Sequence, residues 1–175
     1  KVLADWNGLA ITALAEAGAT FGETAWLRAA MEAYDFIAHK MASGKDGGLN
    51  RAACAGKLTG QGFLDDYANM ARAALSLYEA TGRARYLTDA ETWAAVVLAD
   101  FRDHEHGGFF FTSRHGESLI TRTRSSIDSA TPSGNGVFVG VLAKLFYLTG
   151  NAVYGDEARA VINAFAGELA RNFIS

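Results

Sequence analysis

The sequence predicts an all-α protein whose three helical hairpins form about half of an (α/α)6 toroid, with a small β-hairpin insertion. The first observation is a repeat: Gly107-Gly108-Phe109 follows Gly47-Gly48-Leu49 by 60 positions, and Tyr86-Leu87 follows Trp26-Leu27 by 60. The second is that each repeat pairs a segment apolar on nearly all sides with a segment that has one apolar face. Because an all-round apolar helix is a buried one, the first helix of each pair is expected inside the ring and the second outside. Tetratricopeptide and HEAT repeats, of about 34 and about 40–47 residues, are too short for this period.

Six helices account for most of the chain. A glycine follows the first helix of each pair, and glycine readily adopts the left-handed conformation found at helix C-termini. These terminating glycines are Gly18, Gly82 and Gly150. The expected helices are 7–18, 23–41, 66–81, 85–102, 134–149 and 155–173.

A β-hairpin is expected near 108–123, before the third pair of helices. Phe109–Thr112 and Leu119–Arg122 are rich in aromatic and β-branched residues, and His115-Gly116 lies between them as a turn. The segment that follows Gly47-Gly48 is expected to be a loop.

The composition excludes several classes of protein. With 16 Lys+Arg against 19 Asp+Glu, the net charge is -3, so no basic surface for nucleic acid is indicated. No uninterrupted apolar run reaches the roughly 18 residues of a membrane span. Cys54 is the single cysteine, which excludes an internal disulfide and zinc sites built on paired thiolates, and favours a reducing, cytoplasmic location. His104 and His106 lack a third nearby ligand, so neither a metal nor another cofactor is predicted.

The whole of 1–175 is interpreted as one partial toroid domain. Because a closed ring of this type commonly has six hairpins, the remainder is expected before Lys1, after Ser175, or in a second copy of the chain.

Polar clusters stand at the start of each expected inner helix. They are Asp5-Trp6-Asn7, Asp65-Asp66-Tyr67 and the stretch from Ile127 to Gly136, which holds the single proline, Pro132. Inner helices of a toroid run roughly parallel, so equivalent starts fall at one end of the ring. We therefore expect these clusters to line one shared concave surface. Within the third cluster, Ser133 or Asn135 is expected to cap the helix, and Gly134 and Gly136 permit close approach of the backbone.

Four motifs carry a resemblance to a known family. They are K-V-L-A-D-W-N-G-L at 1–9, F-L-D-D-Y-A at 63–68, G-G-F-F-F-T at 107–112 and D-S-A-T-P-S-G-N at 128–135. In this order they resemble the C-terminal region of the YyaL-type proteins, the spermatogenesis-associated protein 20 family. The resemblance implies a six-hairpin toroid like those of glycosidases and N-acylglucosamine 2-epimerases, attached to a thioredoxin-like domain that is absent from this sequence. Gly136 departs from the family pattern, which usually has a small residue such as Ser there.

Three aspartates are the candidate catalytic residues: Asp65, Asp66 and Asp128. Adjacent carboxylates at a helix start repel one another, which can raise one pKa toward a value useful for acid–base catalysis. The alternative is that one carboxylate caps the helix, where the helix dipole favours acids, and the other meets solvent or an arginine. A glycosidase needs a second carboxylate roughly 5–10 Å from the first, and Asp5 or Asp128 could supply it.

The candidate substrate-binding residues belong to the same clusters and to the expected hairpin. Trp6 and Tyr67 could stack on a sugar ring or simply pack in the core. Arg122 could bind an anionic group, as could Arg124, or either could pair with Asp128. The full set is Asp5, Trp6, Asn7, Tyr67, Arg122, Ser133 and Asn135.

Three functions are consistent with these features. The first is a carbohydrate-processing domain, hydrolase-like or epimerase-like, that binds a sugar-like small molecule. The second is a non-catalytic module that binds a ligand or a protein for an attached thioredoxin-like domain. The third is a scaffold without a small-molecule site. The bases that proton-transferring epimerases use are histidines, and none can be placed on this sequence, which disfavours the epimerase reading.

Overall fold

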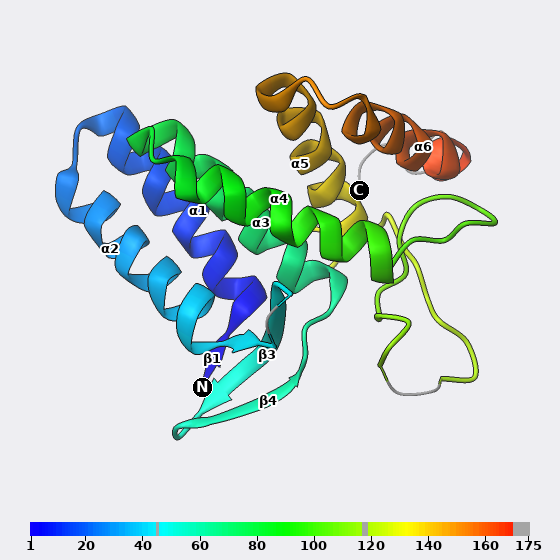
Figure 1. Cartoon of the computed structure of the whole chain (residues 1–175), viewed down its shortest axis with the longest axis horizontal. Coiled ribbons are helices and arrows are strands. Elements are labelled where there is room, and N and C mark those ends of the chain that lie inside the picture. Colours follow the sequence, from blue (N-terminus) through cyan, green and yellow to red (C-terminus); the bar gives the residue numbers. More distant parts are fainter. Residues whose placement is uncertain (45, 117–118, 170–175) are drawn as a thin grey trace.

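The computed structural model describes residues 1–44, 46–116 and 119–169 (Figure 1). All six predicted helices are confirmed in these residues, and the end of the last prediction, 170–173, lies outside them. A π-helical turn, Phe36–Lys40, continues the second helix. The helices are α1 (Ala4–Phe21), α2 (Thr24–Asp35), α3 (Leu64–Thr81), α4 (Ala84–Asp100), α5 (Gly134–Thr149) and α6 (Ala152–Leu169).

The helices form two layers. In the inner layer α3 packs between α1 and α5, and in the outer layer α2, α4 and α6 pack against α1, α3 and α5 respectively (Figure 1). Twelve of the eighteen residues of α3 are buried, against five of seventeen in α4. This confirms the predicted inner position of α3 and outer position of α4, the central pair of helices. The helices α5 and α6 are buried to a similar extent, because α5 lies at one edge of the inner layer.

Glycines end the inner helices, but not all at the predicted residue. Gly82 and Gly150 adopt the left-handed conformation after α3 and α5, as expected. The prediction that Gly18 ends α1 is wrong: α1 continues to Phe21, and Gly22 takes the left-handed position. Gly18 instead permits close packing, because a Cβ there would lie 3.0 Å from the backbone nitrogen of Leu27 on α2.

A small antiparallel sheet lies at the end of the molecule where the inner helices begin. Its longest strand, β3 (Gly48–Cys54), pairs with β1 (Val2–Leu3), β2 (Ala42–Ser43) and β4 (Lys57–Gln61). The expected loop after Gly47-Gly48 is therefore wrong. The turn is Ala55-Gly56, with φ of 48° and 75°, a two-residue turn that Gly favours. The strand lacks the β-branched residues that would have revealed it.

The predicted hairpin near 108–123 is also wrong. Its described residues contain one isolated β-bridge, from Phe109 to Arg102 outside the segment, and no strand. The reason is that other groups satisfy the backbone of the expected first strand. The Asn135 amide bonds both the N–H and the carbonyl of Phe109, and Phe110 donates to the carbonyl of Phe101. Residues 117–118 of the expected turn lie outside the described residues.

Candidate functional site

The starts of the three inner helices converge at one end of the molecule (Figure 1). The Asp66 carboxylate accepts the backbone N–H of Asp5 at 3.0 Å and that of Phe63 at 2.8 Å, which ties α1 to α3. The neighbouring Asp65 carboxylate accepts the backbone N–H of Gly134, which ties α3 to α5. Two adjacent aspartates on the central helix thus hold the three starts together.

The start of α5 lies against Asp65. A Cβ built on Gly134 would lie 2.3 Å from Asp65 Oδ1 and 2.7 Å from Leu64 Cγ, so glycine is needed there. Ser133 is the N-cap of α5: its Oγ accepts the backbone N–H of Gly136 at 3.1 Å. Of the two residues expected to cap this helix, Ser133 does so and Asn135 has a different role.

Burial changes the acidity of both aspartates. Desolvation raises the pKa of Asp66 to about 7, with a further increase from the negative charge of Asp5, against the opposing backbone N–H groups of Phe63 and Asp5. Burial also raises the pKa of Asp65, and the N–H of Gly134 opposes that shift. Both carboxyl groups therefore hold a proton to a higher pH than an ordinary aspartate.

A hollow of about 140 Å³ lies between the starts of α3 and α5 and the segment that precedes α5. Asp65, Ser133 and Asn135 line it, together with Pro132 and Gly134. Asp65 is the acidic residue among the described residues of this lining. The candidate site is therefore built around Asp65.

Asp66 and Asp128 lie outside the lining of this hollow. Asp66 is 2% exposed, and each of its carboxylate oxygens accepts a backbone N–H. Asp128 is exposed, and its Oδ1 accepts the backbone N–H of Ser133 at 2.8 Å, which closes the turn before α5. Both carboxylates thus shape the backbone around the hollow.

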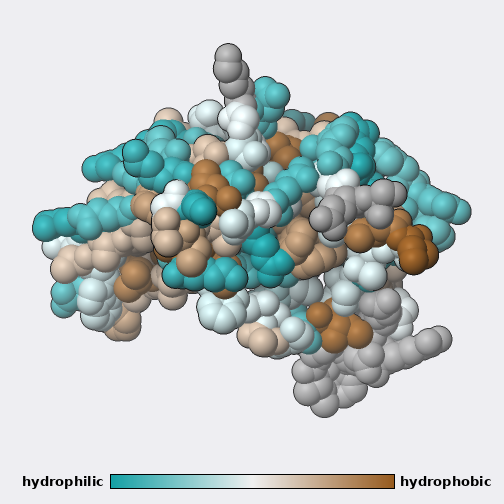
Figure 2. All heavy atoms as spheres, turned by 90° about the horizontal axis from the view of Figure 1, so that it is seen from below, coloured by the Kyte–Doolittle hydropathy of each residue, from teal (hydrophilic) through white to brown (hydrophobic). Residues whose placement is uncertain are grey.

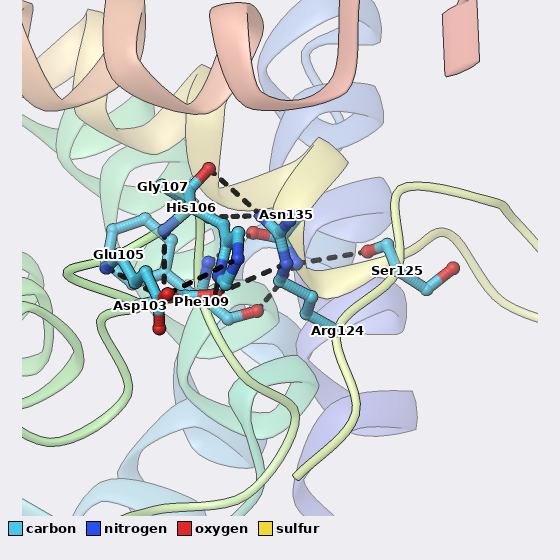
Figure 3. A network of polar contacts seen from close by, with 8 residues as sticks. All are labelled: Asp103, Glu105, His106, Gly107, Phe109, Arg124, Ser125 and Asn135. Atoms are coloured by element: carbon cyan, nitrogen blue, oxygen red, sulfur yellow. Dashed lines mark hydrogen bonds and ion pairs between the residues drawn. The ribbon is translucent and has the colours of Figure 1, made fainter. Parts of the chain in front are cut away.

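Asn135 fastens the segment after Gly107-Gly108 to α5 (Figure 3). It is 2% exposed, accepts the N–H of Phe109 at 2.9 Å, and donates to the carbonyls of Phe109 at 2.9 Å and Ser125 at 3.0 Å. This amide therefore sets the position of the chain that walls the hollow.

The arginines bond neighbouring parts of the protein. Arg122 donates to the carbonyls of Thr112 and Asp100, and its guanidinium lies 4.2 Å from the centre of the Phe110 ring. Arg124 donates to the carbonyl of Gly107 and pairs with Asp103 at 3.3 Å (Figure 3). The expected pairing of either arginine with Asp128 is thus replaced by these contacts.

The remaining predicted residues divide between core and surface. Tyr67 is 2% exposed, packs against Phe101, and accepts the N–H of Leu49 at 2.9 Å, which matches the core-packing alternative. Asn7 donates to the carbonyl of Leu3 at 2.8 Å. Trp6, by contrast, is 61% exposed at the start of α1, where its ring is open to a ligand.

Sequence reasoning missed part of the other wall of the hollow. Phe111, Thr123 and Ser125 line it, beside Ile127 and Thr131 of the predicted Ile127–Gly136 cluster. The signal that could have found them is the run of small hydroxyl residues between Thr121 and Ser133, because such residues offer hydrogen bonds without filling space.

The described residues contain no group of three or more His, Cys, Asp or Glu side chains arranged to hold a metal ion. Among them, no helix is both long and apolar enough to cross a bilayer.

This chain is similar to known proteins in both sequence and fold. The profile of glycosyl hydrolase family 76 matches residues 4–173. Spermatogenesis-associated protein 20 of Rattus norvegicus is 34% identical over 98% of this chain, and that of Homo sapiens is 30% identical over the same share. The chain spans 23% of the length of each of these relatives.

Two solved structures are similar in fold. A family 76 α-mannanase from Bacteroides thetaiotaomicron has a TM-score of 0.70 and 15% identity, and covers 96% of this chain and 46% of its own. A cellobiose 2-epimerase from Spirochaeta thermophila has a TM-score of 0.71 and 18% identity, and covers 93% of this chain and 42% of its own. The fold is thus that of the (α/α)6 toroid proteins, of which these three hairpins form a part. The chain belongs to glycosyl hydrolase family 76, and the predicted resemblance to the spermatogenesis-associated protein 20 family is confirmed.

Proposed function

We propose that this chain forms part of a carbohydrate-processing toroid whose hollow at the inner helix starts binds a sugar unit beside Asp65. The observation that carries the proposal is the position of Asp65. It bonds the start of α5 and lines the hollow with Ser133 and Asn135. The family 76 match and the similarity to a mannanase and an epimerase support a carbohydrate as the ligand.

The chemistry that fits this position is proton donation. Burial raises the pKa of Asp65, so the carboxyl group holds its proton to a higher pH than an ordinary aspartate, and this proton is the one that it would give to the leaving glycosidic oxygen during hydrolysis. Asp5 is a candidate for the second carboxylate, since its negative charge raises the pKa of both Asp65 and Asp66. Its part would be to accept a proton from the attacking water, so that the bond to the sugar breaks as water adds. Asp66 and Asp128 act as positioning residues for the backbone around this pair.

We assign fewer residues to substrate contact than the sequence predicted. Trp6 offers an open ring for stacking, and Ser133 and Asn135 offer polar groups to the hollow. We assign Asn7, Tyr67 and Arg122 to the support of the site, because each bonds the backbone of a neighbouring segment.

A second function has a specific observation in its favour. Of the three aspartates predicted to be catalytic, Asp65 alone lines the hollow, and two carboxyl groups are required for ordinary glycoside hydrolysis. This favours a non-catalytic module that binds a sugar-like ligand for an attached thioredoxin-like domain. The free, exposed Cys54 suits a reducing compartment such as the cytoplasm for either function.

The edges of the inner layer point to a larger assembly. Ala10 is exposed on α1, as is Tyr147 on α5. The chain spans under half of the similar toroids. We propose that 1–175 is one partial domain and that further hairpins cover these edges, either from the rest of its own toroid or from a second copy of the chain.

Turnover and binding experiments separate these functions. The protein containing this chain is incubated with α-mannan oligosaccharides and with cellobiose, as wild type, as Asp65→Asn, and as Asp156→Asn at an exposed position on α6. Shorter products that depend on Asp65 support a hydrolase, and a 2-epimer supports an epimerase. Binding without turnover supports the module. If neither sugar binds, the carbohydrate proposal is rejected.

A further inference from the structure

The turns at Gly47 and Gly107 pack in the same way on the outer helix that follows each of them. A Cβ built on Gly47 would lie 2.5 Å from the Thr92 side chain on α4, and one built on Gly107 would lie 3.3 Å from the backbone oxygen of Ala160 on α6. Ala160 follows Thr92 by the same interval that separates the starts of α4 and α6. The two junctions between successive repeats are therefore equivalent: the first lies between α2 and α4, and the second between α4 and α6.

The backbone beside these turns keeps the same equivalence. Ala42 pairs with Leu49 in the sheet. Arg102 and Phe109, each 60 positions further along the chain, form a β-bridge. Ala42 therefore occupies at the first junction the place that Arg102 occupies at the second.

The second junction contains a buried ion pair. Arg102 Nη2 lies 2.6 Å from Glu157 Oε1, and the Glu157 side chain is 10% exposed. A carboxylate that is removed from water in this way needs a charged or hydrogen-bonding partner, and the Arg102 guanidinium provides one. The residue equivalent to Glu157 at the first junction, at the interval that separates α4 from α6, is Asp89.

At the first junction, a hollow of about 240 Å³ lies beside Asp89. Ala42 lines this hollow, together with Trp93 and His39. No Lys or Arg is among the described residues of its lining. The first junction thus has the acidic side chain of the pair, and a hollow bordered by Ala42 where the second junction has the arginine.

The Asp89 carboxylate is bonded to a neutral group. Its Oδ2 accepts the Tyr34 hydroxyl at 2.8 Å. Arg85, one turn earlier on α4, pairs with Asp35 at 2.9 Å instead. Within the described part of the chain, no cation forms an ion pair with Asp89, so its charge is available to a ligand in the hollow.

The rest of the lining suits a small planar cation. Trp93 is 4% exposed, and a tryptophan ring attracts a cation that lies over its face. His39 Nδ1 donates to the backbone carbonyl of Asp35 at 2.8 Å, so Nε2 of the neutral ring is a hydrogen-bond acceptor. The volume is below the roughly 300–1,000 Å³ of sites for drug-sized ligands, which indicates a smaller ligand.

The sheet end of the molecule has a mixed surface. Figure 2 shows this end from below, with hydrophobic residues in small patches among hydrophilic ones. Because broad apolar patches mark protein or membrane partners, this surface suits a small polar ligand better.

We propose that the hollow beside Asp89 binds a guanidinium group of a separate molecule, in the place that Arg102 takes at the second junction. The Asp89 carboxylate and His39 accept its N–H groups, and Trp93 packs on its planar face. A guanidinium fits better than an ammonium, because its planar fork of donors matches a carboxylate. The group belongs either to a free guanidine compound or to an arginine side chain of a polypeptide. This site is separate from the sugar site at Asp65, and neither proposal depends on the other.

NMR titration of the protein containing this chain with n-propylguanidinium, N-acetylarginine amide, n-propylammonium and neutral n-propylurea tests this proposal. Propylguanidinium should bind at least about tenfold more tightly than propylurea, which has the same shape without the charge. It should also bind more tightly than propylammonium. Tighter binding of N-acetylarginine amide than of propylguanidinium supports a polypeptide as the source, and the reverse order supports a free compound.

Two variants separate the carboxylate from the space beside it. Asp89→Asn should weaken propylguanidinium binding at least about tenfold. Ala42→Arg should abolish the binding and raise the melting temperature, because the new side chain takes the place of the ligand and pairs with Asp89. The matched control is Asp156→Asn, at an exposed aspartate on α6, which should bind as wild type does. If Asp89→Asn does not fold, Ala42→Arg decides the question, since it keeps the bond between Asp89 and Tyr34.

Arg102→Ala tests the equivalence of the two junctions. It opens the place beside Glu157, so propylguanidinium should restore part of the thermal stability that this variant loses. Absence of any restoration would overturn the equivalence on which the site rests. Equal affinities for propylguanidinium and propylurea, or binding unchanged in Ala42→Arg, would overturn the site itself. Stronger binding of propylammonium would overturn the assignment of a guanidinium.

Discussion

The connections that follow Gly47-Gly48 and Gly107-Gly108 begin alike and are held differently. In the first, the backbones of β3 and β4 pair with each other, from Asn50 opposite Gln61 to Cys54 opposite Lys57. In the second, the Phe111 N–H donates to the Thr123 carbonyl, and side chains satisfy other backbone groups: Asn135 bonds Phe109, and Arg122 bonds the carbonyl of Thr112.

This difference explains why the second connection carries the site. The β3–β4 hairpin is held by a ladder of its own backbone bonds, so its position depends less on α5. A segment held by Asn135 is positioned by α5, the helix whose start also meets Asp65. The start of α5 therefore positions both the Asp65 carboxylate and the wall of the hollow that it lines, and a ligand site requires such support.

Replacement of Asn135 by Ala should have the largest effect. The buried N–H and carbonyl of Phe109 would lose their partner, at about 1–3 kcal/mol for each orphaned group, so about 2–6 kcal/mol of unfolding free energy should be lost. Chemical denaturation measures this loss. The control is Asn50→Ala, whose amide bonds the carbonyls of Met41 and Ala42 beside an intact sheet, and should cost about 1 kcal/mol. Equal losses at the two positions would contradict the comparison.

The second-largest expected effect is a dependence of the unfolding free energy on pH. The pKa of Asp66 is about 7 in the folded state, against 3.8 for an ordinary aspartate. Between these values the unfolded chain has released its proton and the folded chain has kept it. The contribution of Asp66 to stability is therefore greatest below about pH 4 and falls until about pH 7, by at most on the order of 4 kcal/mol at 1.36 kcal/mol per pKa unit.

Denaturation of wild type and Asp66→Asn across pH 4 to 7 measures this contribution. In Asp66→Asn, most of this fall in stability with pH should be absent. The part of the fall that remains is assigned to Asp65, whose pKa is also raised. Asp128→Asn, at an exposed aspartate, should retain the decline. If the stability of wild type relative to Asp66→Asn rises over this range, the Asp66 pKa is lowered and not raised.

Gly134→Ala tests the close approach of α5 to Asp65. The new Cβ would lie 2.3 Å from Asp65 Oδ1, so the helix start or the carboxylate must shift, at about 1–3 kcal/mol. Gly140→Ala on the same helix meets no atom within 4 Å and should be neutral or stabilising by up to about 1 kcal/mol. Thermal denaturation of both variants measures this difference, and a harmless Gly134→Ala would mean that the two starts are not in contact.

The sequence predicted the helices and the shared end of the ring better than it predicted the connections. The helices and inner starts follow from apolar periodicity and from the repeated Gly-Gly motif, which are local signals. The strand β3 is rich in Ala and lacks such a signal, so only its pairing with β1 and β4 reveals it. The aromatic run at Phe109 has a strong strand signal, but the Asn135 side chain, 26 residues away, takes its backbone bonds.

For the same reason, the sequence indicated where the candidate site lies but not the role of each of its residues. Residue types at helix starts correctly indicated where polar groups gather, because starts of parallel helices share one end. They could not show which carboxylate faces the hollow, since Asp65 and Asp66 differ only in the direction that each takes from α3. Asp66 turns to the backbone of α1 and Asp65 to that of α5.

Trp6→Ala should have the smallest effect on stability. The side chain is 61% exposed, so the unfolding free energy should change by at most about 0.5 kcal/mol. Sugar affinity should nevertheless fall about three- to tenfold if the ring stacks on the ligand. Trp26→Ala, at an exposed position near the far end of α1, serves as the control and should leave the affinity unchanged. Equal affinities for wild type and Trp6→Ala would remove Trp6 from the site.

The most direct test of the account is titration of α-mannotriose into wild-type protein, Asp65→Ala and Asp156→Ala. Asp156 is an exposed aspartate on α6, so its removal controls for the loss of one carboxylate. We predict that wild type and Asp156→Ala bind equally, and that Asp65→Ala loses about 10- to 100-fold in affinity, as expected for one hydrogen bond to a charged or strongly polar group. Triose affinity unchanged in folded Asp65→Ala would contradict a sugar site at the starts of α1, α3 and α5.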